Sequence, residues 1–341
     1  MRSFLGLFSR RAANALALVL ACGASFSPAA AGDLDAIQSA FDTTFGTTTR
    51  APRSYASAFE AQVAALASAQ DGRIGVAALD LTTGRTVSVL GDQPFPMAST
   101  SKIAIVATFL DGVDQGRFHL TDQYPLMIPV PSRKFDGPVA PVRAGTLYSA
   151  LDLIEMTITR SDNHATDALL AVVGGPQAVN RWSRRAGLSD LHIDRDIATL
   201  VRDDGAVDPA RTIDTRDAAT PRAMVRLVSG VYRGEWLSAS SRAVLLGAME
   251  RCLTGKKRMR ALLPEEARVA HKTGTLYNTS SDVGFFHMPD GRPIAAMRAC
   301  ALRRLRRRSR RATPHRGALI GATQSPSPRG RGIPRFMSAA N

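Results

Sequence analysis

Apolar residues recur at every second position in two neighbouring segments of the first hundred residues. Ile74, Val76 and Ala78 alternate with other residues over 73–80, and a similar run covers 86–90. This period is that of a strand with one buried face, and the glycine-containing segment 82–84 between the two runs is typical of a turn. The pattern predicts a two-stranded antiparallel hairpin, preceded by an alanine-rich helix over 57–70.

The middle of the chain has helical spacing instead. Apolar positions predict a buried helix over 101–112 that begins near Ser99 or Thr100. Four further helices are expected, over 151–159, 165–173, 223–232 and 238–252, whereas residues 194–221 show no period. Strand patterns return over 269–275, 283–288 and 292–297.

Strands at both ends with helices between them define the expected architecture. We predict an α/β fold of the α+β type, in which an antiparallel sheet from both chain ends is packed with helices. An all-helical lobe over about 99–260 is inserted, and the active site lies between the two parts. The chain has 341 residues, 45% of them hydrophobic, which is enough for a large core.

Residues 1–31 have the order of a cleavable secretory signal peptide. Three arginines precede the mostly apolar run 12–26, and small residues lead to an expected cut between Ala31 and Gly32. The run is too short for a membrane span. We therefore expect a periplasmic or secreted protein with no span after cleavage; twin-arginine export and a lipoprotein anchored at Cys22 stay open as alternatives.

The net charge of +15 is unevenly distributed. All 29 acidic residues lie between Asp33 and Asp290, while 12 of the 44 basic residues lie from Arg298 onward and three precede Asp33. The body is therefore formally neutral, and its charge does not predict nucleic-acid binding.

Three short motifs carry candidate chemistry. Ser99 and Lys102 lie three residues apart at the start of the expected helix, which places a hydroxyl and an amine on one face. Ser161-Asp162-Asn163 follows at an expected loop, and Lys272-Thr273-Gly274 lies on an expected strand. Each motif alone is weak, but their order and their placement on helix, loop and strand make coincidence improbable.

In these motifs the chain resembles the class A β-lactamases and penicillin-binding proteins, from about Tyr55 to Met297. The resemblance implies that Ser99 attacks the lactam carbonyl with Lys102 as the neighbouring base, and that Ser161 relays a proton. The backbone N–H groups of Ser99 and Thr275 would form the oxyanion hole. The implied substrate-binding residues are Asn163, Lys272, Thr273, Gly274 and Thr275.

The chain departs from this family at the base that releases the acyl group. Class A enzymes use a glutamate of the omega loop, and no glutamate lies between Glu155 and Glu235. Arg195 and Asp217 match the ends of that loop and are expected to form its closing ion pair. Counting back from the end of the loop places Asp204 at the glutamate position, whereas counting forward places Ile197 there, beside Asp196. We take Asp204 as the candidate base, with Asp196 as the less favoured choice.

The expected carboxylate pocket also lacks a cation that relatives have. No Lys or Arg lies between Lys272 and Arg292, so we expect carboxylate binding to rest on Lys272 and hydroxyl groups and to be weak. No cofactor is expected. The six histidines are scattered without a ligand pattern, so we expect no metal either. Three cysteines, one each in leader, body and tail, imply no disulfide framework.

The expected domains are therefore the signal peptide 1–31, a catalytic domain 32–297 and a basic tail 298–341. The tail replaces the amphipathic helix with which family members end, and its composition is that of an out-of-frame reading of GC-rich DNA. The predicted function is an exported, monomeric serine hydrolase that opens small-molecule β-lactams through an acyl-enzyme on Ser99. The alternatives are a slow penicillin-binding or D,D-peptidase-like protein, and an inactive relative whose tail binds polyanions.

Overall fold

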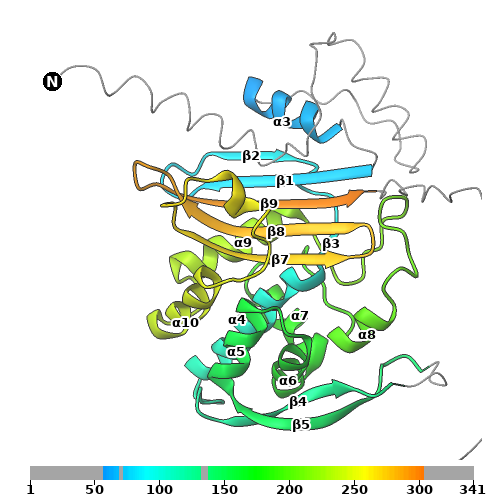
Figure 1. Ribbon diagram of the computed structural model, residues 1–341. Helices are drawn as coiled ribbons and strands as arrows, with labels where there is room; N and C mark the ends of the chain where they lie inside the picture. Colours follow the sequence, from blue (N-terminus) through cyan, green and yellow to red (C-terminus); the bar gives the residue numbers. More distant parts are fainter. Residues whose placement is uncertain (1–56, 69–71, 132–136, 303–341) are drawn as a thin grey trace, which may run out of the picture. The chain divides into compact units, whose positions relative to one another are not determined.

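The computed structural model describes residues 57–68, 72–131 and 137–302. Its largest sheet has five antiparallel strands in the order β2-β1-β9-β8-β7 (Figure 1). The first two, β1 (Gly72–Asp80) and β2 (Thr86–Val89), form the predicted hairpin; the others are β7 (Val269–Leu276), β8 (Thr279–His287) and β9 (Pro293–Leu302). Because β1 pairs with β9 along its whole length, the sheet is built from both ends of the chain, as predicted.

The last strand extends beyond the expected end of the catalytic domain. Strand β9 continues past Met297 to Leu302, and Ala299, Cys300 and Ala301 are buried in it. These small side chains fit a central strand that is covered on both faces. Cys300 therefore belongs to the sheet and not to the tail. The predicted signal peptide 1–31 and residues 303–341 lie outside the described residues.

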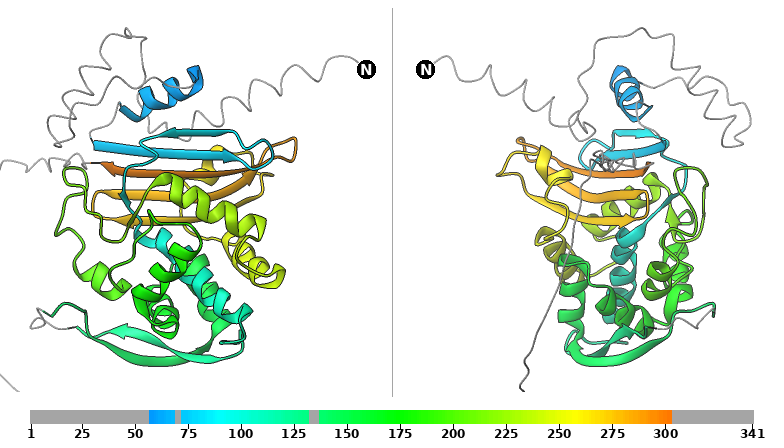
Figure 2. Two further views of the ribbon diagram at one scale, coloured as in Figure 1. Left: turned by 180° about the vertical axis from the view of Figure 1, so that it is seen from behind. Right: turned by 45° about the vertical axis from the view of Figure 1, so that its right-hand side comes forward.

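Helices pack on both faces of this sheet. Helix α3 (Ala58–Ser68) buries Val63, Ala64 and Ala67 against Ile74 of β1. Helix α9 (Pro221–Arg233) packs on the opposite face of the sheet. Side chains along a strand point alternately to its two faces, and Ala77 of β1 points to this second face, where it joins the main core. The view from behind in Figure 2 has α9 in front of the sheet.

The inserted lobe contains the predicted helices. A short 3₁₀ turn, η1 (Ala98–Ser101), leads into α4 (Lys102–Asp114), whose residues Ile103 to Val106 are fully buried. Around it lie α5 (Ala150–Thr159), α6 (Asn163–Val173) and α10 (Ala239–Glu250), all expected, and α7 (Gly175–Arg185), which the sequence analysis did not identify.

The lobe is not all-helical, which corrects the prediction. Strands β4 (Gln123–Pro129) and β5 (Val142–Ser149) form a two-stranded antiparallel sheet, with a register shift between Pro125 and Met127. Prolines argue against a central strand, but they are tolerated where a strand has a free edge. This is why the sequence pattern did not reveal the hairpin.

The non-periodic stretch 194–221 forms a long loop that carries one short helix, α8 (Ile197–Arg202). The loop ends in β6 (Ala218–Ala219), which pairs with β3 (Phe95–Pro96) just before Ser99. The Met97 N–H also donates to the Asp217 carbonyl, 3.0 Å away. The end of the loop is therefore fixed directly to the segment that presents Ser99. A second 3₁₀ turn, η2 (Met259–Leu262), lies before β7.

Candidate active site

Ser99 lies in a strained turn at the start of the buried helix. Its predecessor Ala98 has φ of +50°, a left-handed conformation that costs a non-glycine residue about 1–3 kcal/mol and is found at functional sites. The hydroxyls of Thr100 and Ser101 fix the turn by donating to the carbonyls of Met97 and Ala98. Ser99 is partly exposed while both its neighbours are buried, so the turn presents this one hydroxyl at the surface of the site.

Lys102 is fully buried next to the Ser161 motif. Its Nζ donates to the Ser161 carbonyl and to Asn163 Oδ1, both at 2.7 Å, and lies 3.3 Å from Ser161 Oγ. Burial lowers the pKa of Lys102 well below its usual value, and the charge of Lys272 lowers it further, against the attraction of Asp162 and Asp167. A lowered pKa favours the neutral amine, which can accept a proton.

Ser161 connects the two lysines of the site. Lys272 Nζ donates to Ser161 Oγ at 2.9 Å, and the same oxygen lies 3.3 Å from Lys102 Nζ. Burial lowers the pKa of Lys272 to about 8. Ser161 itself has φ of +60° and is followed by Asp162, whose side chain caps α6 at the Ala165 N–H. The loop thus holds the hydroxyl where a proton could pass between the two amines.

Strand β7 brings the third motif against the segment before Ser99. A Cβ on Gly274 would lie 2.5 Å from the Met97 carbonyl oxygen, so only glycine permits this close approach. Thr273 and Thr275 flank this glycine. The Thr273 hydroxyl lies 2.6 Å from Thr254 Oγ1. The Thr275 hydroxyl lies 2.6 Å from the guanidinium of an arginine. The motif residues predicted from separate parts of the sequence therefore meet in one place.

The arginine is Arg258, a cation that was not among the predicted site residues. Arg258 Nη2 donates to Thr275 Oγ1 at 2.6 Å, and its Nη1 donates to the Gly274 carbonyl at 2.9 Å. Arg258 comes from the connection between α10 and β7, outside the interval that the sequence analysis searched. Its charge beside Thr275 suits an anionic group.

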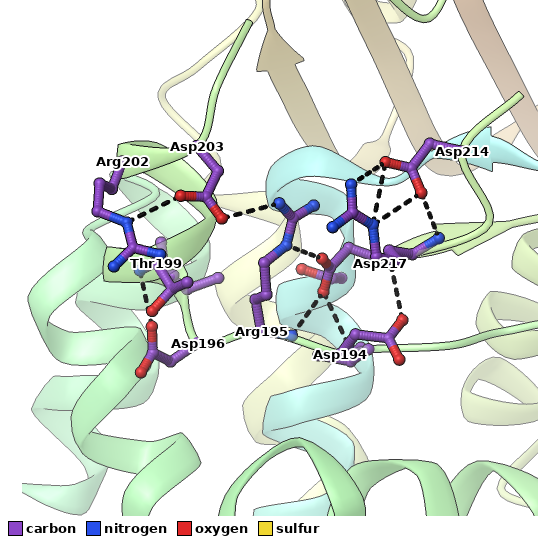
Figure 3. Close-up of polar contacts among 12 residues, drawn as sticks. Asp194, Arg195, Asp196, Thr199, Arg202, Asp203, Asp214 and Asp217 are labelled. Atoms are coloured by element: carbon purple, nitrogen blue, oxygen red, sulfur yellow. Dashed lines mark hydrogen bonds and ion pairs between the residues drawn. The ribbon is translucent and has the colours of Figure 1, made fainter. Parts of the chain in front are cut away.

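The omega loop is closed by the predicted ion pair (Figure 3). Arg195 Nε donates to Asp217 Oδ2 at 2.7 Å, and both side chains are largely buried. Asp217 Oδ1 accepts from the N–H groups of Asp194 and Arg195, and the Asp217 N–H returns a bond to Asp194 Oδ2. Asp203 adds a second contact to Arg195 at 3.3 Å. The two ends of the loop are thereby held together.

Neither candidate base of the omega loop meets the other motif residues. Asp204 is exposed, and its Oδ1 accepts from the Tyr277 N–H at 2.8 Å. Asp196 caps α8 by accepting from the Thr199 N–H at 2.7 Å. Among the described residues, neither carboxylate has a hydrogen bond to Ser99, Lys102 or Ser161. Asp196 therefore acts locally as a helix cap, whereas Asp204 connects the omega loop to the turn that follows β7.

A different carboxylate, Asp167, lies beside the start of α8. It is on α6, one turn after Asn163, and only 6% exposed. Its two oxygens accept from the N–H groups of Ile197 and Ala198, at 2.7 and 2.9 Å. Burial raises the pKa of Asp167 to about 6 against these two hydrogen bonds. Ile197 is the residue that counting forward along the omega loop places at the glutamate position. Its backbone is therefore fixed by Asp167, a residue of α6.

Asp167 and Arg258 could not be predicted as site residues from the sequence, because both join the site through long-range packing. Asp167 is the only acid of the helix at 163–173, and that pattern alone gives it no special place. A cavity of about 340 Å³ next to Asp167 is lined in part by Asn163 and Ile197. Within the part of the chain that the structure describes, no three His, Cys, Asp or Glu side chains are placed to hold a metal ion.

Comparison with known proteins agrees with this arrangement. A family model described as "Beta-lactamase enzyme family" matches residues 58–312. The chain is 35% identical to a β-lactamase of Streptomyces fradiae over 69% of this chain and 75% of that protein, and 34% identical to β-lactamase L2 of Stenotrophomonas maltophilia over 67% and 73%.

Solved structures give the same class. An ancestral class A β-lactamase (GNCA) has a TM-score of 0.61 and 33% identity, over 72% of this chain and 92% of that one. A point mutant of PBP-A, solved as an acyl-enzyme complex with penicillin G, has a TM-score of 0.62 and 28% identity, over 74% and 90%. The chain belongs to the β-lactamase enzyme family and has the class A fold.

Proposed function

We propose that this protein opens β-lactam rings through an acyl-enzyme on Ser99. The observation that carries the proposal is the buried Lys102, which lies one helical turn after Ser99, contacts Ser161 and Asn163, and has a pKa lowered toward the neutral amine. A base, a nucleophile and a proton relay are the minimum for serine acylation. The implied substrates are small-molecule β-lactams.

Acylation follows from the placed groups. Lys102 takes the proton of the Ser99 hydroxyl as its oxygen attacks the lactam carbonyl, and the backbone N–H groups of Ser99 and Thr275 stabilise the oxyanion. Ser161, which Lys272 holds at 2.9 Å, passes a proton to the departing lactam nitrogen. Lys272, Thr273 and Arg258 bind the substrate carboxylate, with Arg258 supplying the second cation.

Release of the acyl group is the step for which a base is missing. Ile197 lies at the forward-counted glutamate position, and the buried carboxylate of Asp167 beside it already accepts two backbone hydrogen bonds. This observation favours a second candidate function, a slow penicillin-binding protein of the D,D-peptidase type that acylates readily and turns over slowly. The similarity to a PBP-A variant that was solved as an acyl-enzyme with penicillin G supports this candidate.

We further propose that the protein is exported and that its activity confers β-lactam resistance. The leader-like residues 1–31 support export. None of the helices in the described ranges is long and apolar enough to cross a bilayer. A periplasmic or secreted enzyme would meet its substrate before the antibiotic reaches the cell-wall enzymes.

The acylation site is tested by peptide mapping after brief exposure to benzylpenicillin and acid quench. We expect a covalent adduct on the peptide that contains Ser99, and none in Ser99→Ala. Ser189→Ala is the control, because this serine is exposed and belongs to none of the three motifs, so the variant should acylate normally. An adduct that persists in Ser99→Ala would contradict the proposal.

A further inference from the structure

A cysteine, a histidine and an aspartate form a cluster behind the strand that carries Lys272. Cys252 follows helix α10, is partly exposed, and has its Sγ 3.3 Å from Thr254 Oγ1. Thr254 Oγ1 in turn lies 2.6 Å from Thr273 Oγ1. A single threonine therefore separates the thiol from a residue of the proposed carboxylate pocket.

The histidine of the cluster is oriented by a buried carboxylate. His271 Nδ1 lies 2.9 Å from Asp282 Oδ1, and the two side chains are 1% and 2% exposed. His271 and Thr273 are two residues apart on β7 and share one face of the sheet, so the imidazole and Thr254 both approach Cys252 from that face. Asp282 on β8 fixes the imidazole, as the third group does in activated Cys–His pairs.

This environment favours the thiolate. Burial raises the pKa of Cys252, but hydrogen bonds with His271 and Thr254 outweigh it and lower the pKa to about 7. Burial lowers the pKa of His271, but its hydrogen bonds with Asp282 and Cys252 raise it to about 9. Between these two values the pair exists as a thiolate and an imidazolium.

Further cations surround the thiol. Arg258 and Lys272 both interact electrostatically with Cys252, and Lys256 and Lys257 are exposed four and five residues after it. Cys252 is itself partly exposed, and the adjacent Leu253 is 60% exposed. The other described cysteine, Cys300, is 2% exposed within β9, which makes it a matched comparison.

We propose that Cys252 is a reactive thiol that is modified by small anionic disulfides, and that this modification inhibits the neighbouring site. His271 accepts the thiol proton, and the thiolate attacks one sulfur of the disulfide. A new S–S bond forms on Cys252 while the old S–S bond breaks, and the second sulfur leaves with the electron pair as a thiolate. Cys252 is oxidised, the leaving sulfur is reduced, and a dithiol reverses the exchange.

The inhibition arises from crowding. The attached group needs space beside Thr254, which contacts Thr273, and its negative charge competes with substrate carboxylate for Arg258 and Lys272. We expect the second-order rate constant of acylation to fall by about tenfold or more. This consequence rests on the proposed function, whereas formation of the mixed disulfide is read by mass and does not depend on it.

The test treats the purified protein with dithionitrobenzoate, an anionic disulfide, and with cystamine, a cationic one, and maps the modified peptides. We expect Cys252 to react with a rate that is half-maximal near pH 7. After each rate constant is divided by that of the same reagent with a free thiol, the value for dithionitrobenzoate should exceed that for cystamine by at least about tenfold at low salt. Acylation by benzylpenicillin should fall and return on reduction. Cys252→Ser should acylate normally and resist both reagents, while Cys300→Ser should behave as wild type.

Variants of the histidine sharpen the test. His271→Asn should shift the half-maximal pH toward the ordinary thiol value of about 8.5, and the wild-type pH profile serves if this variant does not fold. Preferential reaction at Cys300, or a wild-type midpoint near about 8.5, would overturn the assignment of a reactive thiol. Full acylation of Ser99 in protein modified at Cys252 would overturn the inhibitory role. A mixed disulfide at Cys252 in a protein whose Ser99 is never acylated would instead point to failure of the proposed function.

Discussion

At the scale of single residues, burial decides the chemistry of this site. Lys102 and Lys272 are both fully buried, and two ammonium groups that share the Ser161 hydroxyl disfavour each other's charge. Desolvation and mutual repulsion act in the same direction, toward a neutral amine at Lys102. The sequence places these residues on one helix and one strand, but only their packing around Ser161 gives them this property.

Lys102→Met should therefore lower the rate of acylation by benzylpenicillin by about 10²–10⁴-fold, because it removes the base while keeping an apolar chain of similar length. Lys257→Met, at an exposed position, is the control and should change the rate little. Stopped-flow measurement of acylation checks this, with thermal unfolding to confirm that both variants are folded. A Lys102→Met rate within about tenfold of wild type would be incompatible with the assigned role.

Asp167 should make stability depend on pH in an unusual direction. Its pKa is raised from 3.8 to about 6, so the folded protein holds this proton more tightly than the unfolded chain. The contribution to stability is present below about pH 4 and is lost as the pH rises through about 6. Urea unfolding between about pH 4 and about pH 7 should show wild type losing about 2 kcal/mol relative to Asp167→Asn. A constant difference across this range would contradict the burial argument.

At the scale of elements, most of the regular fold could be predicted from the sequence, whereas helix α7 and the irregular parts could not. The β1–β2 hairpin, the strands β7 to β9 and helices α4, α5 and α6 follow from their hydrophobic periods. Helix α8 and the β4–β5 hairpin do not, because so short a helix shows no period and prolines obscured a strand. The position of the Asp204 side chain could not be predicted either. Asp204 lies in a non-periodic loop, and counting residues along such a loop does not determine where each one lies in space.

Helix α8 supplies the sharpest test of the slow-release hypothesis. Ile197 begins α8 and lines the cavity next to Asn163, so Ile197→Glu should place a carboxylate where a hydrolytic water could be activated. We expect acyl-enzyme decay to accelerate by about tenfold or more, with acylation nearly unchanged. Ile197→Gln, of the same shape without the charge, is the control. Equal decay in the two variants would show that the missing carboxylate does not limit release.

At the scale of the whole molecule, one face of the sheet retains an apolar groove. Its lining includes Phe59, Val63, Val76, Phe286 and Met297. Family members are expected to cover such a face with a final amphipathic helix, and the sequence after Leu302 has neither acidic residues nor apolar periodicity. Loss of several buried apolar side chains would cost about 10 kcal/mol, which is comparable with the stability of a domain. We therefore propose that residues after Leu302 are an out-of-frame replacement for that helix.

Deletion of residues 305–341 should then leave both the acylation rate and the unfolding midpoint unchanged, because a chain segment without apolar periodicity adds little to a core. The comparison needs equal expression of the two forms and thermal unfolding of each. A loss of more than about 2 kcal/mol on deletion would mean that the basic tail packs on the folded part and is a genuine element of the protein.

The central claim is that Ser99 opens β-lactams through an acyl-enzyme, and the rate at which the acyl group is released separates the two candidate functions. An intact-mass time course of the protein with excess benzylpenicillin tests it most directly. We predict a single adduct on Ser99 that appears and then decays with release of opened antibiotic, whereas an adduct that persists would favour the slow penicillin-binding candidate. Antibiotic hydrolysis with no accumulated adduct would contradict slow release, and the absence of any adduct or hydrolysis in folded protein would contradict the assigned chemistry.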